Sequence, residues 1–268
     1  MYDVRRFPGV RFAAVAFFFF LYVPIGVLVI LSFNNGESAT VWKGLGLNGY
    51  ANILRDAAAL HAAGTSFAIA SISAAVACLT TLPVALHLWT QSRVKGAVTD
   101  VFVTFPLLIP EIVLAIGTLV IFSFFSIRLN FWTTVFGHTV FCIPLTYLPI
   151  RSALARVDQR WIDAAADLGA NPRQSFAQIV WPLIQNGVFA GFSLAFIVSI
   201  DDFVTTYFLS GSATTTLPMY IYGLIKRGVK PDVNALATVV LVVSFAVASL
   251  SVCLSRATAS GKQLSITG

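Results

Sequence analysis

The stretch AAGTSFAIASISAAVACLTTLPVALHLWT, residues 62–90, decides the fold class of this chain. It contains no Asp, Glu, Lys or Arg, and it is longer than the ~20 apolar residues that carry an α-helix across a hydrocarbon core about 30 Å thick. Its many small residues let helix backbones approach closely in lipid, where no hydrophobic drive brings helices together. The stretch predicts a membrane-spanning helix inside a helical bundle.

Five further apolar runs flank this stretch. They cover residues 11–33, 99–126, 131–150, 187–209 and 234–255. The chain of 268 residues is 57% hydrophobic and only 10% charged, whereas about a quarter of the residues of a soluble domain are charged. No polar segment is long enough for a separate water-soluble core. We therefore expect a single all-α membrane domain, residues 1–268, with about six transmembrane helices.

The basic residues indicate the orientation of these spans. Six spans place both termini on one side, and 11 of the 17 Lys and Arg residues then fall on that side. Because cytoplasmic loops are enriched in Lys and Arg, both termini are predicted to be cytoplasmic. The first run exceeds the roughly 7 to 15 apolar residues of a signal peptide, so we expect it to be retained. The net charge of +6 is dispersed at the ends of the runs, which argues against a nucleic-acid partner.

Motifs typical of enzymes and metal sites are missing from the sequence. It has no G-x-x-x-x-G-K-[ST], H-E-x-x-H or G-x-S-x-G pattern, and a G-x-G-x-x-G at residues 44–49 follows a membrane span rather than a strand. The histidines and cysteines lie on separate segments without metal-ligand spacing. We expect no catalytic residues, no metal site and no cofactor in this chain.

Residues 151–186 form the longest predicted cytoplasmic loop, and their first half has the signals of a short helix. Asp158 can cap a helix N-terminus, and Gly169 can end the helix. Trp161, Ala165 and Leu168 share one face by their spacing. The segment therefore predicts an amphipathic helix.

The second half of the loop begins another helix at Asn171 and Pro172. Its apolar stripe is made of Phe176, Ile179, Val180 and Leu183. Periodicity leaves two interpretations open. The helix pair is either a projecting knob or an anchor that lies in the headgroup layer.

The amino-acid sequence of the loop favours the projecting knob. Asp163-Ala164-Ala165, then Gly169 four residues after Ala165, then Ile179 to Pro182, resemble the E-A-A loop of ABC importer permeases, E-A-A-x3-G-x9-I-x-L-P. Asp163 stands where that family usually has Glu, and Trp181 where it has Leu. The resemblance assigns ATPase coupling to the residues of this loop, namely Asp163, Ala164, Ala165, Gly169, Pro172, Ile179 and Pro182.

This resemblance implies a fold, a location and a set of partners. The fold is the transmembrane domain of a type I ABC importer, a multi-pass protein of the bacterial inner membrane. The partners are a second permease subunit, two copies of a cytoplasmic ATPase that binds ATP and Mg, and a periplasmic binding protein. The chain would thus be a transport component rather than an enzyme, because ATP hydrolysis belongs to the ATPase.

Three further stretches resemble the permeases of spermidine and putrescine importers, in particular the second, C-type, of their two permease subunits. These stretches run from residue 32 to 42, from residue 199 to 203 and from residue 217 to 238. Relatives that import ferric iron, opines or phosphonates share much of them. The resemblance implies polyamine cargo, with another small solute as the alternative.

Acidic residues at membrane depth are candidates for the substrate pathway. Glu111, Asp201 and Asp202 lie inside apolar runs, where an acidic side chain costs about 2.5 to 3.5 kcal/mol and usually faces a cavity or a partner. Carboxylates suit a polycation, and Phe203 and Tyr207 could stack on its ammonium groups.

Structural roles for these acidic residues stay open. Asp201 could brace a helix break, and Glu111 could satisfy backbone groups freed by Pro106 and Pro110. A self-sufficient cation channel or secondary carrier is the competing function. An intramembrane enzyme is disfavoured, because no Ser/His or metal constellation accompanies the acidic residues.

Overall fold

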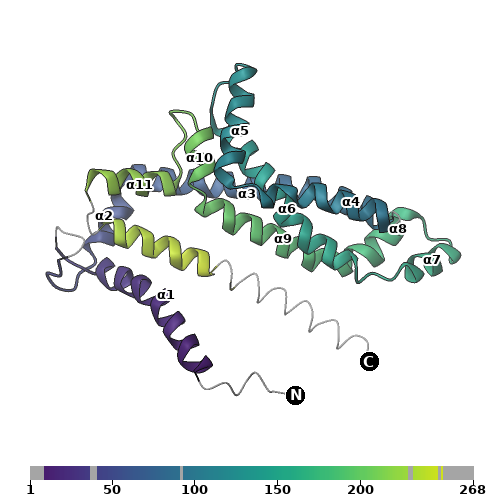
Figure 1. The fold of residues 1–268 in the computed structure, drawn as a ribbon, viewed down its shortest axis with the longest axis horizontal. Coiled ribbons are helices and arrows are strands. Elements are labelled where there is room, and N and C mark those ends of the chain that lie inside the picture. The colour runs from purple at the N-terminus through teal and green to yellow at the C-terminus, as the bar shows by residue number, and fades with distance from the viewer. Residues whose placement is uncertain (1–8, 37–40, 91–92, 229–231, 247–248, 250–268) are drawn as a thin grey trace. The chain divides into compact units, whose positions relative to one another are not determined.

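A computed structural model describes residues 9–36, 41–90, 93–228, 232–246 and 249, and these residues are almost entirely helical (Figure 1). The helices are α1 (Val10–Ser32), α2 (Asn48–Arg55), α3 (Ala57–Trp89), α4 (Arg93–Thr104), α5 (Glu111–Phe124), α6 (Phe131–Leu154), α7 (Gln159–Asp167), α8 (Pro172–Ser175), α9 (Trp181–Asp201), α10 (Val204–Leu209) and α11 (Leu217–Arg227). A 3₁₀ turn, η2 (Phe105–Leu108), follows α4, and a π-helical turn, η3 (Phe176–Val180), joins α8 to α9. A further apolar helix covers Asp232–Ala246.

Four helices in the described part of the chain are long and apolar enough to cross a membrane. They are α1, α3, α6 and the continuous helix Pro172–Asp201. The first three coincide closely with the predicted runs 11–33, 62–90 and 131–150. The predicted run 234–255 begins in the helix Asp232–Ala246, and residues 247–248 and 250–255 lie outside the described residues.

The predicted run 99–126 differs from a simple span, because it is broken. Its two halves, Ala97–Leu108 and Glu111–Phe124, meet at an angle of 97°. Ile109 and Pro110 at the break have extended backbone, with ψ of 130° and 132°. Proline lacks an N–H and disfavours helical backbone at the residue before it, so Pro106 and Pro110 account for the break.

The predicted run 187–209 is also interrupted. Asp202 leaves the helical region with ψ of 115°, so α9 ends at Asp201 and α10 starts at Val204. At its other end α9 is longer than expected. It continues without a break through η3 and α8 back to Pro172, giving a helix of 30 residues. At 1.5 Å per residue this helix is about 45 Å long.

The chain divides into two compact units. The first unit contains residues 1–60 and 220–243. Within it the Ser32 hydroxyl lies 2.6 Å from the Tyr50 hydroxyl, and the Asn34 side chain accepts hydrogen bonds from the backbone of Gly36 and Lys43. These bonds tie residues 32–36 to residues 41–50 after α1.

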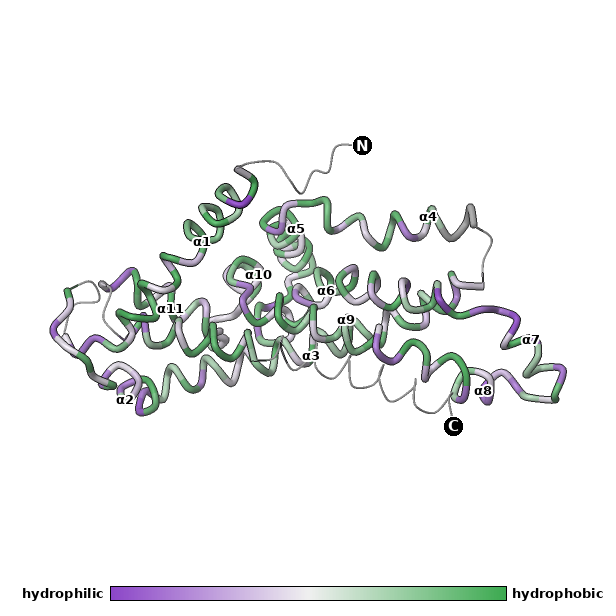
Figure 2. The backbone as a smooth tube through the Cα atoms, turned by 90° about the horizontal axis from the view of Figure 1, so that it is seen from below, coloured by the Kyte–Doolittle hydropathy of each residue, from purple (hydrophilic) through white to green (hydrophobic). Residues whose placement is uncertain are grey.

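The second unit contains residues 61–219 and 244–268, and its core is a layer of three long helices, α3, α6 and α9 (Figure 2). Hydrogen bonds join the layer at several depths. The Ser73 hydroxyl donates to the Val135 carbonyl, and the hydroxyls of Thr81 and Thr146 are 3.0 Å apart. Tyr147 is buried among apolar side chains, and its hydroxyl donates to Asp100 on α4. The broken pair α4–α5 is thereby attached to α6.

Helices α6 and α9 make the most extensive contact between two helices in this unit. A Cβ atom at Gly191 would lie 2.9 Å from the carbonyl oxygen of Thr146, and one at Gly187 would lie 2.9 Å from that of Pro149. Only glycine allows the backbones to approach this closely. Because lipid provides no hydrophobic drive between helices, this contact is a main source of cohesion.

Replacing Gly191 by alanine should therefore destabilise the protein. The added methyl group meets the Thr146 backbone, and overpacking of this kind costs about 1–3 kcal/mol. Gly64 on α3 is the matched control, because a Cβ there meets nothing within 4 Å and alanine favours the helix by about 1 kcal/mol. Thermal unfolding in detergent, followed by size-exclusion chromatography, should show a lower midpoint for Gly191→Ala alone. Equal midpoints for the two variants would contradict the packing argument.

Candidate functional site

The loop between α6 and α9 has the helix caps predicted for it. The Asp158 side chain accepts a hydrogen bond from the N–H of Arg160 at the start of α7. Gly169 ends that helix with φ of +86°, a left-handed conformation that side chains disfavour. The side chain of Asn171 then forms a capping box with Gln174 at the start of α8. The caps fix a sharp reversal between the two helices.

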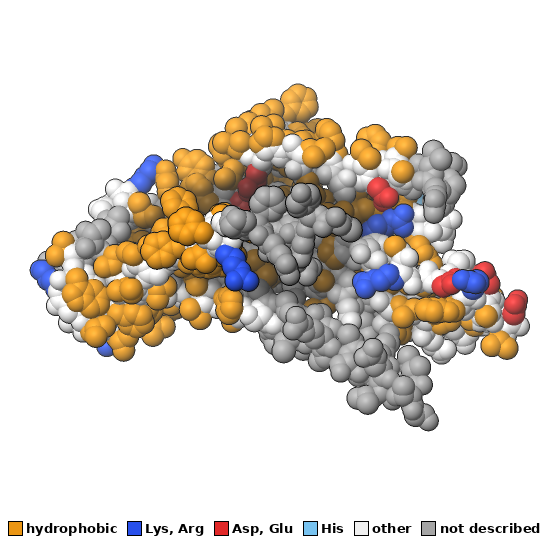
Figure 3. Space-filling model, turned by 60° about the horizontal axis from the view of Figure 1, so that its bottom comes forward, with side chains coloured by type: hydrophobic (Ala, Val, Ile, Leu, Met, Phe, Trp, Pro, Cys, Tyr) orange, Lys and Arg blue, Asp and Glu red, His pale blue; other side chains and the backbone are white. Residues whose placement is uncertain are grey.

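The apolar face of α7 is uncovered in this chain. Trp161 is 50% exposed and Leu168 is 90% exposed. Asp163 is exposed on the same helix, where its carboxylate accepts a hydrogen bond from Gln159 at 3.4 Å. Charged side chains of both signs gather at this end of the second unit (Figure 3). The hydrogen bond from the Arg160 side chain holds the pKa of Asp158 below its usual value, so Asp158 stays ionised.

The second half of the loop packs inward. Val180 is buried in the same apolar cluster as Ile184, and Phe176 packs against this cluster. The predicted stripe of Phe176, Ile179, Val180 and Leu183 is thus part of the continuous helix into α9. The π-helical turn η3 ends just before Trp181 and Pro182. A π-turn of this kind accommodates the backbone carbonyl that a proline leaves without an N–H partner.

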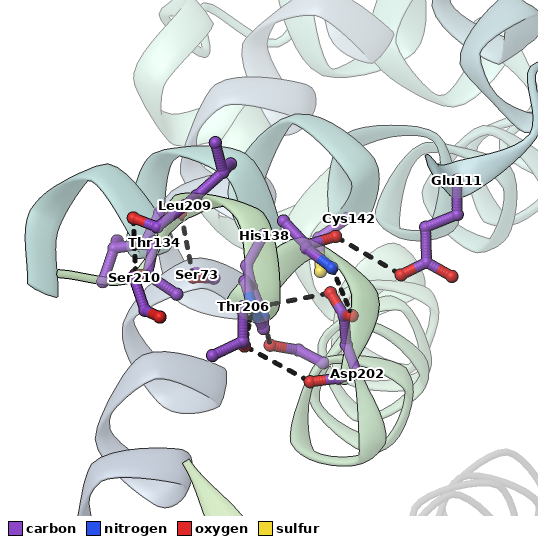
Figure 4. A network of polar contacts seen from close by, with 12 residues as sticks. Ser73, Glu111, Thr134, His138, Cys142, Asp202, Thr206, Leu209 and Ser210 are labelled. Carbon is purple, nitrogen blue, oxygen red and sulfur yellow. Dashed lines mark hydrogen bonds and ion pairs between the residues drawn. The ribbon is translucent and has the colours of Figure 1, made fainter. Parts of the chain in front are cut away.

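A polar cluster lies inside the apolar part of the second unit, where α9 and α10 are separated (Figure 4). Asp202 is buried, and its Oδ1 accepts a hydrogen bond of 2.9 Å from the N–H of Thr205. The Thr205 hydroxyl donates to Glu111 Oε1 at 3.3 Å. The Glu111 carboxyl group also interacts electrostatically with that of Asp202. The structure therefore brings together two of the three predicted acidic residues.

The third acidic residue, Asp201, differs from the other two. Its side chain is exposed, and within the described residues its carboxylate forms no hydrogen bond or ion pair. Phe203 and Tyr207 follow on α10 with ring centroids 5.4 Å apart, and Tyr207 is 52% exposed. Asp201 and Tyr207 thus offer a carboxylate and an aromatic ring to an incoming group. The structural role that the sequence left open for Asp201 belongs to its neighbour Asp202.

His138 on α6 is the polar residue of this cluster that the sequence did not single out. It is fully buried, with Nδ1 2.7 Å from the Ser199 hydroxyl and Nε2 2.9 Å from the Thr206 hydroxyl. Its Nε2 is also 3.4 Å from Asp202 Oδ2. The only hint in the sequence is that an imidazole inside an apolar run needs partners, which threonines and serines at the same depth can provide. No group of three or more potential metal ligands occurs in the described part of the chain.

Comparisons with known proteins agree with this architecture. Residues 82–259 match the family model described as "Binding-protein-dependent transport system inner membrane component". The spermidine/putrescine transport system permease protein PotC of Escherichia coli (strain K12) is 36% identical over 242 residues, covering 90% of this chain and 91% of that protein. The putrescine transport system permease protein PotI of the same strain is 36% identical over 232 residues, covering 84% and 82%.

Solved structures show the same fold at low sequence identity. A bacterial ABC transporter that imports the acidic polysaccharide alginate has a TM-score of 0.69 at 14% identity, covering 91% of this chain and 92% of that chain. The MetNI methionine ABC transporter in an inward-facing conformation has a TM-score of 0.63 at 16% identity, covering 74% and 95%. The predicted fold class, the transmembrane domain of an ABC importer, is confirmed.

Both the family model and the curated relatives cover most of the chain. The loop and the polar cluster lie at opposite ends of the helix Pro172–Asp201. This protein is an inner membrane transport component, a member of the binding-protein-dependent transport permeases in the branch of the spermidine/putrescine systems.

Proposed function

We propose that this chain forms half of the translocation pathway of a polyamine importer. Two relatives that are 36% identical to this chain are named as permeases of a spermidine/putrescine system and of a putrescine system. The observation that carries the proposal is the exposed Asp201 carboxylate at the end of α9, together with the exposed aromatic ring of Tyr207 on α10. A carboxylate and a ring face suit the ammonium groups of a polyamine, which keep their charge at neutral pH.

The loop residues 151–186 couple this pathway to a separate ATPase. The uncovered apolar face of α7, with Trp161 and Leu168, needs a partner, and the resemblance of the Asp163-Ala164-Ala165 to Pro182 motif to the E-A-A loop supports a cytoplasmic ATPase as that partner. Two copies of that subunit bind ATP and Mg and supply the energy. A second permease of the B-type and a periplasmic binding protein complete the importer, with both termini of this chain in the cytoplasm.

The continuous helix Pro172–Asp201 gives the coupling a physical route. One end contains Pro172 of the loop, and the other end contains Asp201 of the pathway. Because α6 packs against this helix through Gly187 and Gly191, the two helices move as a rigid pair. A displacement of the loop by the ATPase is transmitted about 45 Å to the polar cluster.

Removing the charge of Asp201 should reduce uptake without affecting the fold. Asp201→Asn should lower spermidine uptake by up to about fivefold, since an exposed carboxylate that pairs with an ammonium contributes about 0.2–1 kcal/mol. Asp201→Glu keeps the charge and should retain most of the uptake. The measurement is uptake of labelled spermidine into proteoliposomes that contain the complete transporter.

Asp202 provides the contrast to this variant. Asp202→Ala removes the hydrogen bond to the Thr205 N–H, and loss of such a cap costs about 0.5–2 kcal/mol, so its thermal midpoint should fall while that of Asp201→Asn does not. Unchanged uptake in Asp201→Asn would remove Asp201 from the pathway.

Spermidine uptake by this chain reconstituted alone would support a self-sufficient carrier instead.

A side chain at residue 169 should uncouple the transporter. Gly169→Val forces a β-branched residue into φ of +86°, which costs about 1–3 kcal/mol and reorients α7 relative to α8. Gly228 is the matched control, because it has φ of +111° and equally open surroundings outside the loop. Gly169→Val should lower both uptake and recovery of the ATPase on an affinity column, whereas Gly228→Val should not. Similar uptake in the two variants would count against the coupling role of the loop.

A further inference from the structure

His138 bridges the interruption between α9 and α10. Its Nδ1 meets Ser199 on α9, and its Nε2 meets Thr206 on α10, at 2.7 and 2.9 Å. Asp201 lies between the two bridged residues in the chain. Figure 4 shows the imidazole directed into this gap, with Asp202 and Thr206 on its Nε2 side. The imidazole comes from α6, so it links three helices at one point.

The groups around the ring favour one tautomer of this imidazole. Nε2 faces two oxygens, the Thr206 hydroxyl at 2.9 Å and Asp202 Oδ2 at 3.4 Å, and the Thr206 hydroxyl can itself donate to the carbonyl oxygen of Asp202 at 3.3 Å. A carboxylate oxygen attracts a hydrogen and repels a lone pair, which places the ring hydrogen on Nε2. Nδ1 then accepts from the Ser199 hydroxyl. Every polar atom of the ring has a partner in this neutral tautomer.

The Nε2 side of the ring also faces a buried carboxylate oxygen. Asp202 Oδ2 accepts no hydrogen bond within the described residues, and His138 Nε2 lies 3.4 Å from it. Both side chains are essentially inaccessible to solvent, at 0% and 2% exposure. In such surroundings a partly paired carboxylate is strongly attracted to the N–H that points toward it. The position of Asp202, and with it the backbone turn after Asp201, depends on this N–H.

We infer that His138 is a positioning residue for the polyamine site: through its Nε2–H it holds Asp202 and Thr206 in place, and thereby sets where the Asp201 carboxylate meets the cargo. The inference rests on the proposed function for the identity of the cargo. The placement of Asp201 by His138 is a separate geometrical claim. Close packing supports it, because Gly137 on α6 lies directly against Thr205 and Leu209 on α10.

Two amide variants separate the two sides of the ring. In His138→Gln the side-chain nitrogen takes the place of Nε2, and in His138→Asn it takes the place of Nδ1. In proteoliposomes with the complete transporter, we expect His138→Gln to keep an apparent affinity for spermidine near that of the wild type. His138→Asn should weaken it about tenfold, as expected when a buried polar group is left unpaired. The maximal rate of ATP hydrolysis should stay unchanged in both variants, because α7 lies at the other end of the helix pair.

A second readout does not depend on the cargo. A reporter thiol introduced by Asp201→Cys is labelled with a charged methanethiosulfonate, and the rate is compared in the two backgrounds and against protein without the reporter. His138→Asn should alter the labelling rate, whereas His138→Gln should leave it unchanged. His87→Asn, at an exposed histidine on α3, is the control for both readouts.

Each outcome decides the role of His138. Equal effects of the two amide variants, or an unaltered labelling rate in His138→Asn, would overturn the positioning role. If the wild-type transporter takes up no polyamine, the proposed function fails, and the labelling rates alone then decide whether His138 positions residue 201. A fall in maximal ATP hydrolysis in both variants would also overturn the inference, since it indicates a general loss of structure.

Discussion

The close contact between α6 and α9 is the constraint on which the rest of the structure depends. Gly187 and Gly191 let the two backbones approach until a single methyl group would clash with the carbonyl oxygens of Pro149 and Thr146. In lipid, contacts of this kind and interhelical hydrogen bonds hold a bundle together, because burial of apolar surface adds little. Both helices run between the loop and the polar cluster. Their packing therefore makes these two distant regions parts of one rigid body.

The two helix breaks are arranged around this rigid pair. One break follows Pro106 and Pro110 and places Glu111 at the start of α5, and the other follows Asp201. Irregular backbone inside a membrane is tolerated only where it is buried in protein or lines a cavity. At the second break the Thr205 N–H donates to Asp202, and the Thr205 hydroxyl donates to Glu111, so residues from the two breaks meet at one point. The polar cluster is thus a consequence of where the helices break.

Features set by neighbouring residues could be predicted from the sequence, and features set by distant residues could not. Capping by Asp158 and the turn at Gly169 depend on a few adjacent residues, and both predictions are confirmed. His138 bonds to Ser199 and Thr206, which follow it by 61 and 68 positions in the sequence. No local sequence pattern could predict contacts over this separation. Similarly, the residues around Asp201 and Asp202 gave no reason to expect different roles for these two aspartates. Their different exposure follows from the direction in which the chain turns at the end of α9.

This separation of two adjacent aspartates suits the proposed transport of a polycation. A site made of several buried and unpaired carboxylates would bind an ammonium group too tightly for release, whereas conduction requires binding that is strong enough to admit cargo and weak enough to let it leave. Asp202 already has the Thr205 N–H and the imidazole of His138 beside it, so little of its charge is left for the cargo. Asp201 is exposed and forms no hydrogen bond or ion pair within the described residues, so its charge is available to the cargo. In the proposed transporter, one aspartate maintains the shape of the site, and the other makes the reversible contact.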